Sequence, residues 1–598
     1  MNNALPKIAA SQARYRRLVA PVAIFLCALG VRLAYLAQDA SSPFFWHRLI
    51  DAGDYHVLGL RFANRAWPGH EALFRPPLYP LFLGTIYRFL GDDIVTLKAL
   101  QATIGAFSCL LVYFIGRLAF EGRLVAIAAA LLCAFCGTLV YYDLEPLSAN
   151  LDVFLLLLTL WLLLRAAREC RLPPWALAGA ALGLAAVNRG SALVLLPFVL
   201  GWLWRFRRRP GAETAGAIKS AAVLLLSVGV VIAPLAWHNA RYDEFPEARF
   251  AHAVLPPPPE DSTSSLRAVR RIVTGRFSPL GWADGINVYV GNIPEVQRIN
   301  RDDQGQHFAW FDRLFAEPWQ AGVRSASGHS RYFLRKTAAY VRSHPVAWVR
   351  LLVRKALQVV NGTEVPRGRR LYADRLHSSV LWVLLWRRGI AFPSGLLIPL
   401  GLLGLWLARA SWRRHGLVAG ALAAQTIFLL GFFVTARYRA PALPLLALYA
   451  AYVVSRALDL VRDRRAGLRA AAIFVVLLAA CNLPLDPVDE TPSVVEEYGL
   501  ATNLEQQRRL DEAIDHYRAA LRASGVGSDA DFTGLPNTIA DVHYNLGTAL
   551  HRLGRLDEAI VSYRTALRLR PDSSAIQDAL TQALADAQSL KGASPQSP

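Results

Sequence analysis

The sequence predicts an all-α, polytopic membrane protein with about eleven transmembrane helices, followed by an α-helical repeat module. Hydrophobic residues make up 54% of the 598 residues. They gather in runs of roughly 15 to 22 residues that largely exclude charge, as membrane-spanning helices do. After the last run the composition becomes that of an ordinary soluble helical domain. We therefore expect a membrane domain over 1–485 and a separate module over 486–598.

The apolar runs predict the individual spans and their orientation. In chain order they lie near 18–38, 97–119, 123–141, 147–165, 174–188, 191–204, 218–236, 391–408, 416–435, 440–456 and 468–485. Clusters of arginine stand between the runs, and short arginine-rich loops stay in the cytoplasm. With a cytoplasmic N-terminus, eleven spans place all of these clusters inside and the C-terminal module outside. The expected location is the bacterial inner membrane.

The net charge of +21 follows from the same loops. Because the basic residues are spread among membrane spans and do not form one face of a soluble domain, no nucleic-acid partner is expected. The partners that we expect are membrane lipid and, through the C-terminal module, another protein.

Two long loops are predicted on the outer side, over 39–96 and 237–390. Loops of this length are uncommon unless they serve a function. The second loop contains a proline-rich stretch, 255–265, that we expect to be a surface excursion. It also contains the amphipathic stretch 346–360, which carries Arg350, Arg354 and Lys355 and predicts a helix lying at the membrane interface.

The C-terminal module shows an internal repeat. The stretch 540–572 fits the 34-residue tetratricopeptide pattern, and "LDEAIDHYRAAL" at 510–521 matches "LDEAIVSYRTAL" at 556–567. We expect about two repeats and a capping helix over 573–590. Such repeats bind peptides or proteins in a groove, and a structural or dimerising appendage is the alternative.

Cysteine and histidine give no sign of a metal or disulfide site. The six cysteines lie mostly in apolar runs, and the Cys133 and Cys136 pair has no nearby histidine or aspartate ligand, so we expect it to pack structurally. The thirteen histidines form no convincing zinc set. No cofactor or metal is expected to be required, although the acidic loops could hold a divalent ion.

Charged residues at the predicted outer boundary are the first candidates for a functional site, because such charges are costly there unless they serve one. They are Asp51, Asp54, Arg75, Asp143, Glu145, Arg437 and Arg439. Carboxylates suit a general base or a metal, and arginines suit a phosphate. Together they fit a reaction in which a membrane-held phosphate leaves and a hydroxyl attacks. The alternative is that these side chains only solvate the loops and pair with one another.

Several short motifs follow one another in a recognisable order. Asp51 precedes Tyr55 by four positions, and Arg75 opens the sequence Arg-Pro-Pro-Leu-Tyr that ends at Tyr79. Further motifs lie at 183–197 with Arg189, 233–245 with His238, 285–292 with Asn287 and Tyr289, 343–366 with Lys355, and 436–444 with Arg437 and Arg439. This order resembles the GT-C fold glycosyltransferases, specifically the bacterial protein-mannosyltransferase and aminoarabinose-transferase branch.

The resemblance implies an enzyme that moves a sugar from a polyprenyl-phosphate carrier to an acceptor on the outer face, with inversion. It implies that Asp51 activates the acceptor or organises the site. Asp54 and Glu145 are further catalytic candidates because of their position at the outer boundary. Arg75, Tyr79, Arg437, Arg439 and Lys355 would serve the carrier phosphate, and Tyr55, Asp143, Arg189, His238, Asn287 and Tyr289 complete the candidate list.

Two positions depart from the family's pattern. His238 stands where an arginine is usual, and Asn150 stands near where relatives often have a glutamate. The second acid therefore stays open among Asp143, Glu145 and Asp152.

Three functional hypotheses follow. The first is a lipid-linked-sugar glycosyltransferase whose repeats recruit or orient a protein acceptor. The second keeps the enzyme but makes the acceptor a lipid or a cell-surface polysaccharide. The third is a non-catalytic scaffold or transporter, which the lack of charge in the middle of most spans disfavours.

Overall fold

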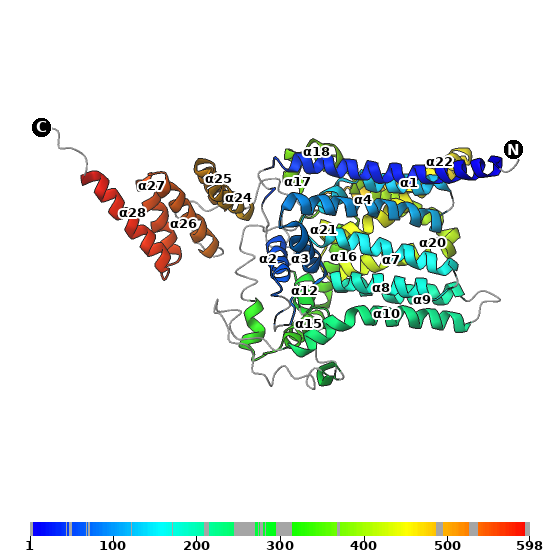
Figure 1. Cartoon of the computed structure of the whole chain (residues 1–598), viewed down its shortest axis with the longest axis horizontal. Coiled ribbons are helices and arrows are strands. Elements are labelled where there is room, and N and C mark those ends of the chain that lie inside the picture. Colours follow the sequence, from blue (N-terminus) through cyan, green and yellow to red (C-terminus); the bar gives the residue numbers. More distant parts are fainter. Residues whose placement is uncertain are drawn as a thin grey trace.

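The computed structural model, shown in Figure 1, is a bundle of long helices with a smaller helical module beyond one end. It describes residues 4–42, 45–46, 51–66, 69, 72–120, 122–169, 171–207, 214–243, 269–272, 274, 279–281, 283–294, 314–366, 371–485, 494–524 and 536–592. Over these residues it contains helices and a single isolated bridge between Trp386 and Phe392, without strands. The predicted all-α membrane fold is confirmed. The proline-rich stretch 255–265 lies outside the described residues.

The membrane domain consists of α1 (Ala4–Asp39), α2 (Asp51–Ala63), α3 (Leu78–Leu90), α4 (Ile94–Ala119), α5 (Arg123–Ala134), α6 (Gly137–Leu144), α7 (Ala149–Glu169), α8 (Pro173–Asn188), η1 (Gly190–Leu195), α9 (Leu196–Arg207), α10 (Thr214–Arg241), α12 (Ala283–Gly291), α15 (Ala326–Ser343), α16 (Pro345–Val360), α17 (Leu371–Asp374), η4 (Arg375–His377), α18 (Ser379–Leu384), α19 (Ser394–Leu407), η5 (Ala408–Ser411), α20 (Trp412–Gly431), α21 (Ala436–Arg439), η6 (Ala440–Ala442), α22 (Leu443–Arg462) and α23 (Arg464–Cys481).

Each predicted span coincides with a helix or with two consecutive helices, but the count of eleven is not confirmed. Within the described residues, length and composition allow six membrane-crossing helices, or seven if α5 and α6 form one span with a 57° bend. The difference arises from short segments. The apolar run 190–205, for example, is too short to cross alone, because a spanning helix needs about 20 residues.

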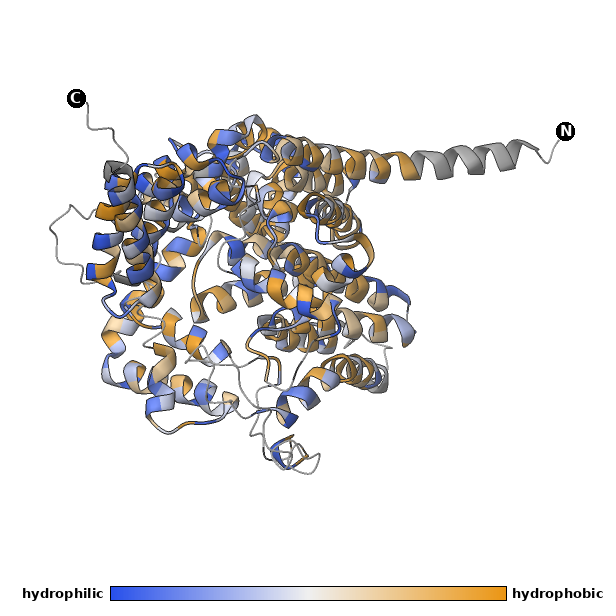
Figure 2. Ribbon diagram, turned by 60° about the vertical axis from the view of Figure 1, so that its left-hand side comes forward, coloured by the Kyte–Doolittle hydropathy of each residue, from blue (hydrophilic) through white to orange (hydrophobic). Residues whose placement is uncertain are grey.

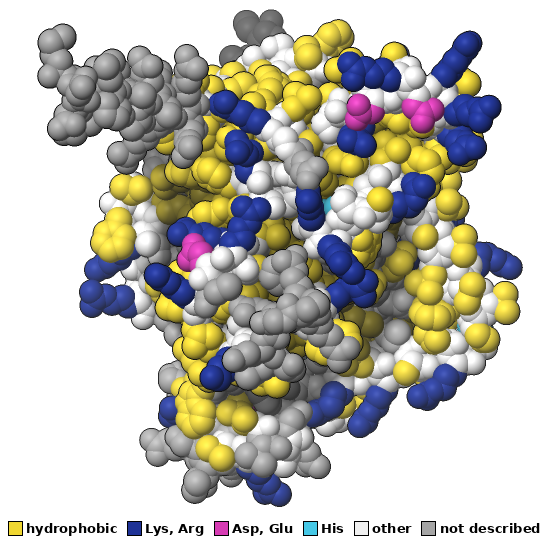
Figure 3. Space-filling model, turned by 90° about the vertical axis from the view of Figure 1, so that its right-hand side faces the viewer, with side chains coloured by type: hydrophobic (Ala, Val, Ile, Leu, Met, Phe, Trp, Pro, Cys, Tyr) yellow, Lys and Arg dark blue, Asp and Glu magenta, His cyan; other side chains and the backbone are white. Residues whose placement is uncertain are grey.

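The two ends of the bundle differ in chemistry. Figure 3 looks onto the end where α9 and α22 finish, and Lys and Arg side chains stand over much of that face. The last turns of α4, α7 and α22 carry Arg117, Arg168 and Arg462, respectively. The opposite end holds α2, α3, α12 and α15 (Figure 1). Figure 2 shows that the long helices are largely hydrophobic.

Charged side chains inside the bundle are paired. The Arg32 guanidinium lies 2.7 Å from Asp143, and the Lys98 ammonium lies 2.6 Å from Asp39, with all four side chains buried. Asn150 adds a hydrogen bond of 2.7 Å to Asp143. A buried charge that loses its partner is strongly destabilising, so these pairs fix how α1 packs against α4 and α6.

Helix α16 is amphipathic as predicted, but one of its three basic residues does not lie on the exposed face. Val346, Val349, Val353 and Leu357 form an exposed apolar stripe at helical spacing, as expected for a helix in contact with lipid. Lys355, in contrast, is buried, and its ammonium donates to the backbone carbonyls of Gly291 and Leu430. The lysine is turned inward because those two carbonyl groups need donors.

The C-terminal module folds as two helix pairs and a final helix: α24 (Val494–Gln506), α25 (Leu510–Ala523), α26 (Pro536–Arg552), α27 (Leu556–Leu569) and α28 (Ser574–Gly592). The repeated tyrosines Tyr517 and Tyr563 are buried in its core. Gly547 is required by close packing, because a Cβ there would come within 2.7 Å of the Tyr563 ring. Close packing against Tyr563 therefore explains why the repeat pattern has a small residue at this position.

Candidate functional site

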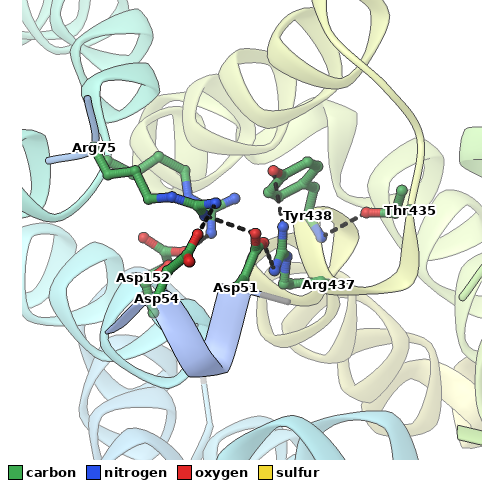
Figure 4. Close-up of polar contacts among 9 residues, drawn as sticks. Asp51, Asp54, Arg75, Asp152, Thr435, Arg437 and Tyr438 are labelled. Atoms are coloured by element: carbon green, nitrogen blue, oxygen red, sulfur yellow. Dashed lines mark hydrogen bonds and ion pairs between the residues drawn. The ribbon is translucent and has the colours of Figure 1, made fainter. Parts of the chain in front are cut away.

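An aspartate bridges two arginines at the end of the bundle opposite the basic face. Asp51 opens α2, and its two carboxylate oxygens accept from Arg75 and Arg437, each at 2.7 Å (Figure 4). Arg75 also binds Asp54 at 2.9 Å. The two arginines are 362 positions apart in the sequence (437 − 75), so the carboxylate joins the first outer loop to the start of α21.

Arg437 is held by local helix geometry. The Thr435 side chain caps α21 by accepting from the Tyr438 backbone amide, which starts the short helix that carries the arginine. The Arg437 guanidinium also donates to the Tyr438 hydroxyl at 3.0 Å. Arg189 lies over the ring of this tyrosine, 4.4 Å from its centroid, and pairs with Asp152 at 2.6 Å. Tyr438 therefore contacts two cations.

These residues line a cleft of about 90 Å³ that is partly open to solvent. The charged side chains on its walls are Asp51, Arg75, Arg189, Asp284 and Arg437, and the other lining residues include Tyr55, Ser148, Asn188, Asn287, Phe428, Phe432 and Tyr438. The motif residues from five separate segments of the chain thus meet here. Three guanidinium groups and two carboxylates can handle an anion and a proton in one place.

A mostly apolar pocket adjoins the cleft. Both are lined by Arg189, Ser191, Phe428 and Tyr438. From there the pocket continues between α7, α8, η1 and α20 along Leu156, Thr159, Leu182, Ala185, Leu195 and Gln425. Asp152 also lines this pocket, so its end next to the cleft is charged and its far end is apolar.

Electrostatics favour charged arginines in the cleft. Burial alone would lower the pKa of Arg75, but the neighbouring Asp51 carboxylate raises that pKa above its usual range, so the guanidinium stays protonated. Burial raises the pKa of Asp54, and Arg75 opposes this rise. The Asp54 side chain is 59% exposed, so it is the outer of the two acids on α2.

Several predicted site residues lie away from the cleft, with partners of their own. Tyr79 is buried and donates to the Gln101 side chain at 3.0 Å, while its ring packs edge-on against Tyr55 at 5.0 Å. Glu145 is buried, and its backbone carbonyl accepts from Gln101. Asp143 is paired with Arg32. These three residues thus have structural partners outside the cleft.

The remaining candidates stabilise the outer loops. Arg439 pairs with Glu364 at 2.8 Å and donates to backbone carbonyls of the segment 358–363. Lys355 is held by carbonyls, as described above. His238 packs against Tyr242, and Tyr289 packs against Phe333 and the Lys336 ammonium.

Two residues that the motifs did not single out are placed to serve the site. Asn239 accepts from the Leu73 backbone amide at 3.0 Å and so fixes the loop that leads to Arg75. In the sequence, its neighbour His238 is the more prominent residue, because it stands where the motif usually has an arginine. Asp284 opens α12 inside the cleft, and a lone acid in the first turn of a helix gives no sequence signal beyond helix stability.

No group of three or more His, Cys, Asp or Glu side chains with a metal-binding arrangement occurs among the described residues. The acids in and around the cleft do not form a cluster, because Asp51, Asp54 and Asp152 are each engaged in an ion pair with an arginine. Independence of a metal stays a prediction.

Comparison with known families agrees with the motif order. A family model of dolichyl-phosphate-mannose-protein mannosyltransferases matches residues 74–237. The predicted resemblance is confirmed there. A tetratricopeptide repeat model matches residues 540–573, which confirms the predicted repeat. The search of curated proteins gave no match. The two family models thus match part of the membrane domain and the second repeat of the C-terminal module.

Solved structures with a similar arrangement were also found. The Archaeoglobus fulgidus oligosaccharyltransferase tethered with an acceptor peptide is 14% identical, with a TM-score of 0.43, over 90% of this chain and 58% of that one. AglB from the same organism, in complex with an inhibitory peptide and a dolichol-phosphate, is 16% identical, with a TM-score of 0.43. The match covers 91% of this chain and 59% of that one. ArnT from Cupriavidus metallidurans in the apo state is 17% identical, with a TM-score of 0.31. The match covers 75% of this chain and 80% of that one. The chain spans less than three fifths of the oligosaccharyltransferase chains.

Proposed function

We propose that the protein is a glycosyltransferase that moves a sugar from a polyprenyl-phosphate donor to an acceptor on the extracytoplasmic side of the bacterial inner membrane. The observation that carries this proposal is the cleft in which Asp51 holds Arg75 and Arg437 together. Two fixed guanidinium groups are a pre-formed site for a phosphate.

In this reaction the phosphate is the leaving group. As the bond between the sugar and the phosphate oxygen breaks, negative charge grows on the phosphate, and the arginines stabilise it. Asp51 keeps both guanidinium groups in place before the donor arrives, so little reorganisation is needed during the reaction. Arg189 lines the same cleft, lies over the Tyr438 ring and can contact the same phosphate.

The adjoining apolar pocket supports a lipid-linked donor over a soluble sugar nucleotide. It shares four lining residues with the cleft and continues between membrane helices α7, α8 and α20. Its apolar side chains suit contact with part of a polyprenyl chain better than with a nucleotide.

The orientation of the bundle supports an extracytoplasmic site. The basic face lies at the end opposite the cleft (Figures 1 and 3), and basic loops stay in the cytoplasm. The repeat module lies beyond the end that holds α2 and α12 (Figure 1), where it could present a protein acceptor to the cleft.

Binding of a polyprenyl phosphate to the purified protein tests the donor site. Arg75→Ala should weaken binding about 10- to 100-fold, because it removes a charge-assisted contact of about 1.5–3 kcal/mol. Arg88→Ala is the matched control, since Arg88 is an exposed arginine in the last turn of α3. Equal affinity of the Arg75→Ala variant and the wild type would exclude Arg75 from the donor site.

A further inference from the structure

The two carboxylates of the cleft stand in opposite electrostatic situations. Asp51 places one oxygen on Arg75 and the other on Arg437, both at 2.7 Å. To take a proton, it would have to weaken an ion pair with a group that the donor phosphate needs. Asp51 is therefore suited to positioning the arginines and poorly suited to accepting a proton.

Asp284 is the other carboxylate on the cleft wall, and it is exposed to the cleft. No hydrogen bond or ion pair joins its side chain to another residue in the part of the chain that the structure describes. Its oxygen lies close to Gly190, where an added Cβ would stand 3.4 Å from Oδ2. A methyl group at this position would therefore be in van der Waals contact with the carboxylate.

The backbone fixes Asp284 relative to the phosphate-binding loop. The Ala283 amide donates to the Phe74 carbonyl at 3.3 Å, which ties the residue before Asp284 to the residue before Arg75. On the other side, Gly285 packs so closely on α15 that a Cβ would meet the Ser330 carbonyl at 2.2 Å. Helix α12 thus holds Asp284 between two rigid neighbours.

The surroundings of Asp284 favour its neutral form more than usual. The cleft walls partly remove water from around the carboxylate, which raises the pKa of Asp284 to about 6. The other charged groups that line the cleft are Asp51, Arg75, Arg189 and Arg437. On α15, burial lowers the pKa of His329 and keeps it neutral, and Lys336 is paired with Glu317.

We propose that Asp284 is the general base that accepts the proton of an acceptor hydroxyl, an inference that rests on the glycosyl transfer proposed above. The acceptor oxygen forms a bond to the anomeric carbon while the bond from that carbon to the phosphate oxygen breaks. The hydroxyl proton passes to Asp284, and the electron pair of the broken bond leaves with the phosphate on Arg75 and Arg437. Asp284 then returns the proton to solvent, to which it is exposed.

A neighbouring amide can orient the acceptor. Asn287 follows Asp284 by one helical turn and lines the same cleft. Residues three apart share a face of a helix, so the amide and the carboxylate can contact one acceptor molecule. The alternative is that Asp284 only stabilises the first turn of α12 through the helix dipole, a role that requires no contact with substrate.

The test compares Asp284→Asn and Asp284→Glu with the wild type in a transfer assay between pH 5 and 8, with the full-length protein in detergent. For the wild type, kcat should rise through about pH 6, because the base must be ionised. Asp284→Asn should lower kcat about 10²- to 10⁴-fold and abolish this rise, with the donor KM unchanged. Asp284→Glu should restore part of the rate. Asp92→Asn, at an exposed carboxylate between α3 and α4, is the control.

The possible outcomes separate the two proposals. Transfer by the wild type together with a loss in Asp284→Asn supports the base. An Asp284→Asn variant that keeps more than a third of the wild-type kcat, or keeps the rise through pH 6, would overturn the inference and leave the proposed function standing. If the wild type transfers no sugar at all, the proposed function fails, and Asp284 has no proton to accept.

Discussion

At the scale of single residues, two aspartates one helical turn apart on α2 differ sharply in what they hold. Asp51 binds two arginines with a side chain that is 22% exposed, whereas Asp54 binds Arg75 alone and is 59% exposed. A second ion partner and stronger burial make an ion pair more costly to lose. We therefore expect the loss of Asp51 to disturb the site more than the loss of Asp54.

Replacing each aspartate by asparagine tests this difference. Asp51→Asn should lower transfer about 100-fold, because both guanidinium groups lose the carboxylate that positions them for the phosphate. Asp54→Asn should cost no more than a few fold. Initial rates with a saturating acceptor measure both variants, and comparable losses in the two would show that Asp51 has no special position.

Asp143 illustrates a charged residue whose role is structural. Its carboxylate is buried against Arg32, so Asp143→Leu leaves a buried guanidinium without its partner and should destabilise the fold by about 3–5 kcal/mol. The double variant Arg32→Met with Asp143→Leu should recover most of that loss. Thermal unfolding in detergent measures both. A double variant as unstable as the single one would mean that the pair itself is not the source of the effect.

At the scale of elements, the two repeats of the C-terminal module use the same left-handed turn with different residues. Gly554 has φ of 75° in the second repeat, and Arg508, 46 positions earlier (554 − 508), has φ of 63° in the first. Glycine adopts this conformation freely, whereas other residues pay about 1 kcal/mol or more. The first repeat therefore carries local strain that the second does not.

Exchanging these residues should change the stability in opposite directions. Arg508→Gly should stabilise the module by about 1 kcal/mol, and Gly554→Arg should destabilise it by a similar amount. Pulse proteolysis of the full-length protein in urea, with detection of fragments from the module, follows both variants. A destabilising Arg508→Gly would show that contacts of the arginine side chain outweigh the strain of its backbone.

At the scale of the whole molecule, the repeat module can be separated from the membrane domain by truncation. The chain can be cut after residue 485, because the last turn of α23 is tied to the outer loops: the Gly362 amide donates to the Cys481 carbonyl, and Asn361 donates to Leu483. Deleting 486–598 should abolish transfer to a protein acceptor and keep turnover of a small acceptor within a few fold. Equal losses on both would indicate that the module only stabilises the enzyme, and a lipid or polysaccharide acceptor would then be favoured.

The sequence predicted the architecture and much of the cleft because both leave local signals. Apolar runs mark the helices, and the motifs around Asp51, Arg75, Arg189, Asn287 and Arg437 meet in the cleft as the resemblance implied. Partners could not be predicted, since they depend on distant packing. The sequence does not distinguish Arg439 and Lys355 from Arg437 as candidates for binding phosphate. In the structure, a glutamate pairs with Arg439 and backbone carbonyls accept from Lys355, both away from the cleft.

The number of spans shows the same limit. An apolar run reveals that a segment is buried in an apolar environment, but its length alone does not decide whether it crosses the membrane. The break between α5 and α6, with its bend of 57°, could only be seen once the helices were packed.

The most direct test of the central proposal is sugar transfer by the purified protein in lipid vesicles, with a radiolabelled polyprenyl-phosphate sugar and a membrane extract as acceptor. The label should leave the polyprenyl carrier in the presence of the wild type, and the double variant Arg75→Ala with Arg437→Ala should abolish this transfer. Absence of transfer by the wild type across donors and extracts, or transfer at an undiminished rate by the double variant, would contradict the function proposed for this cleft.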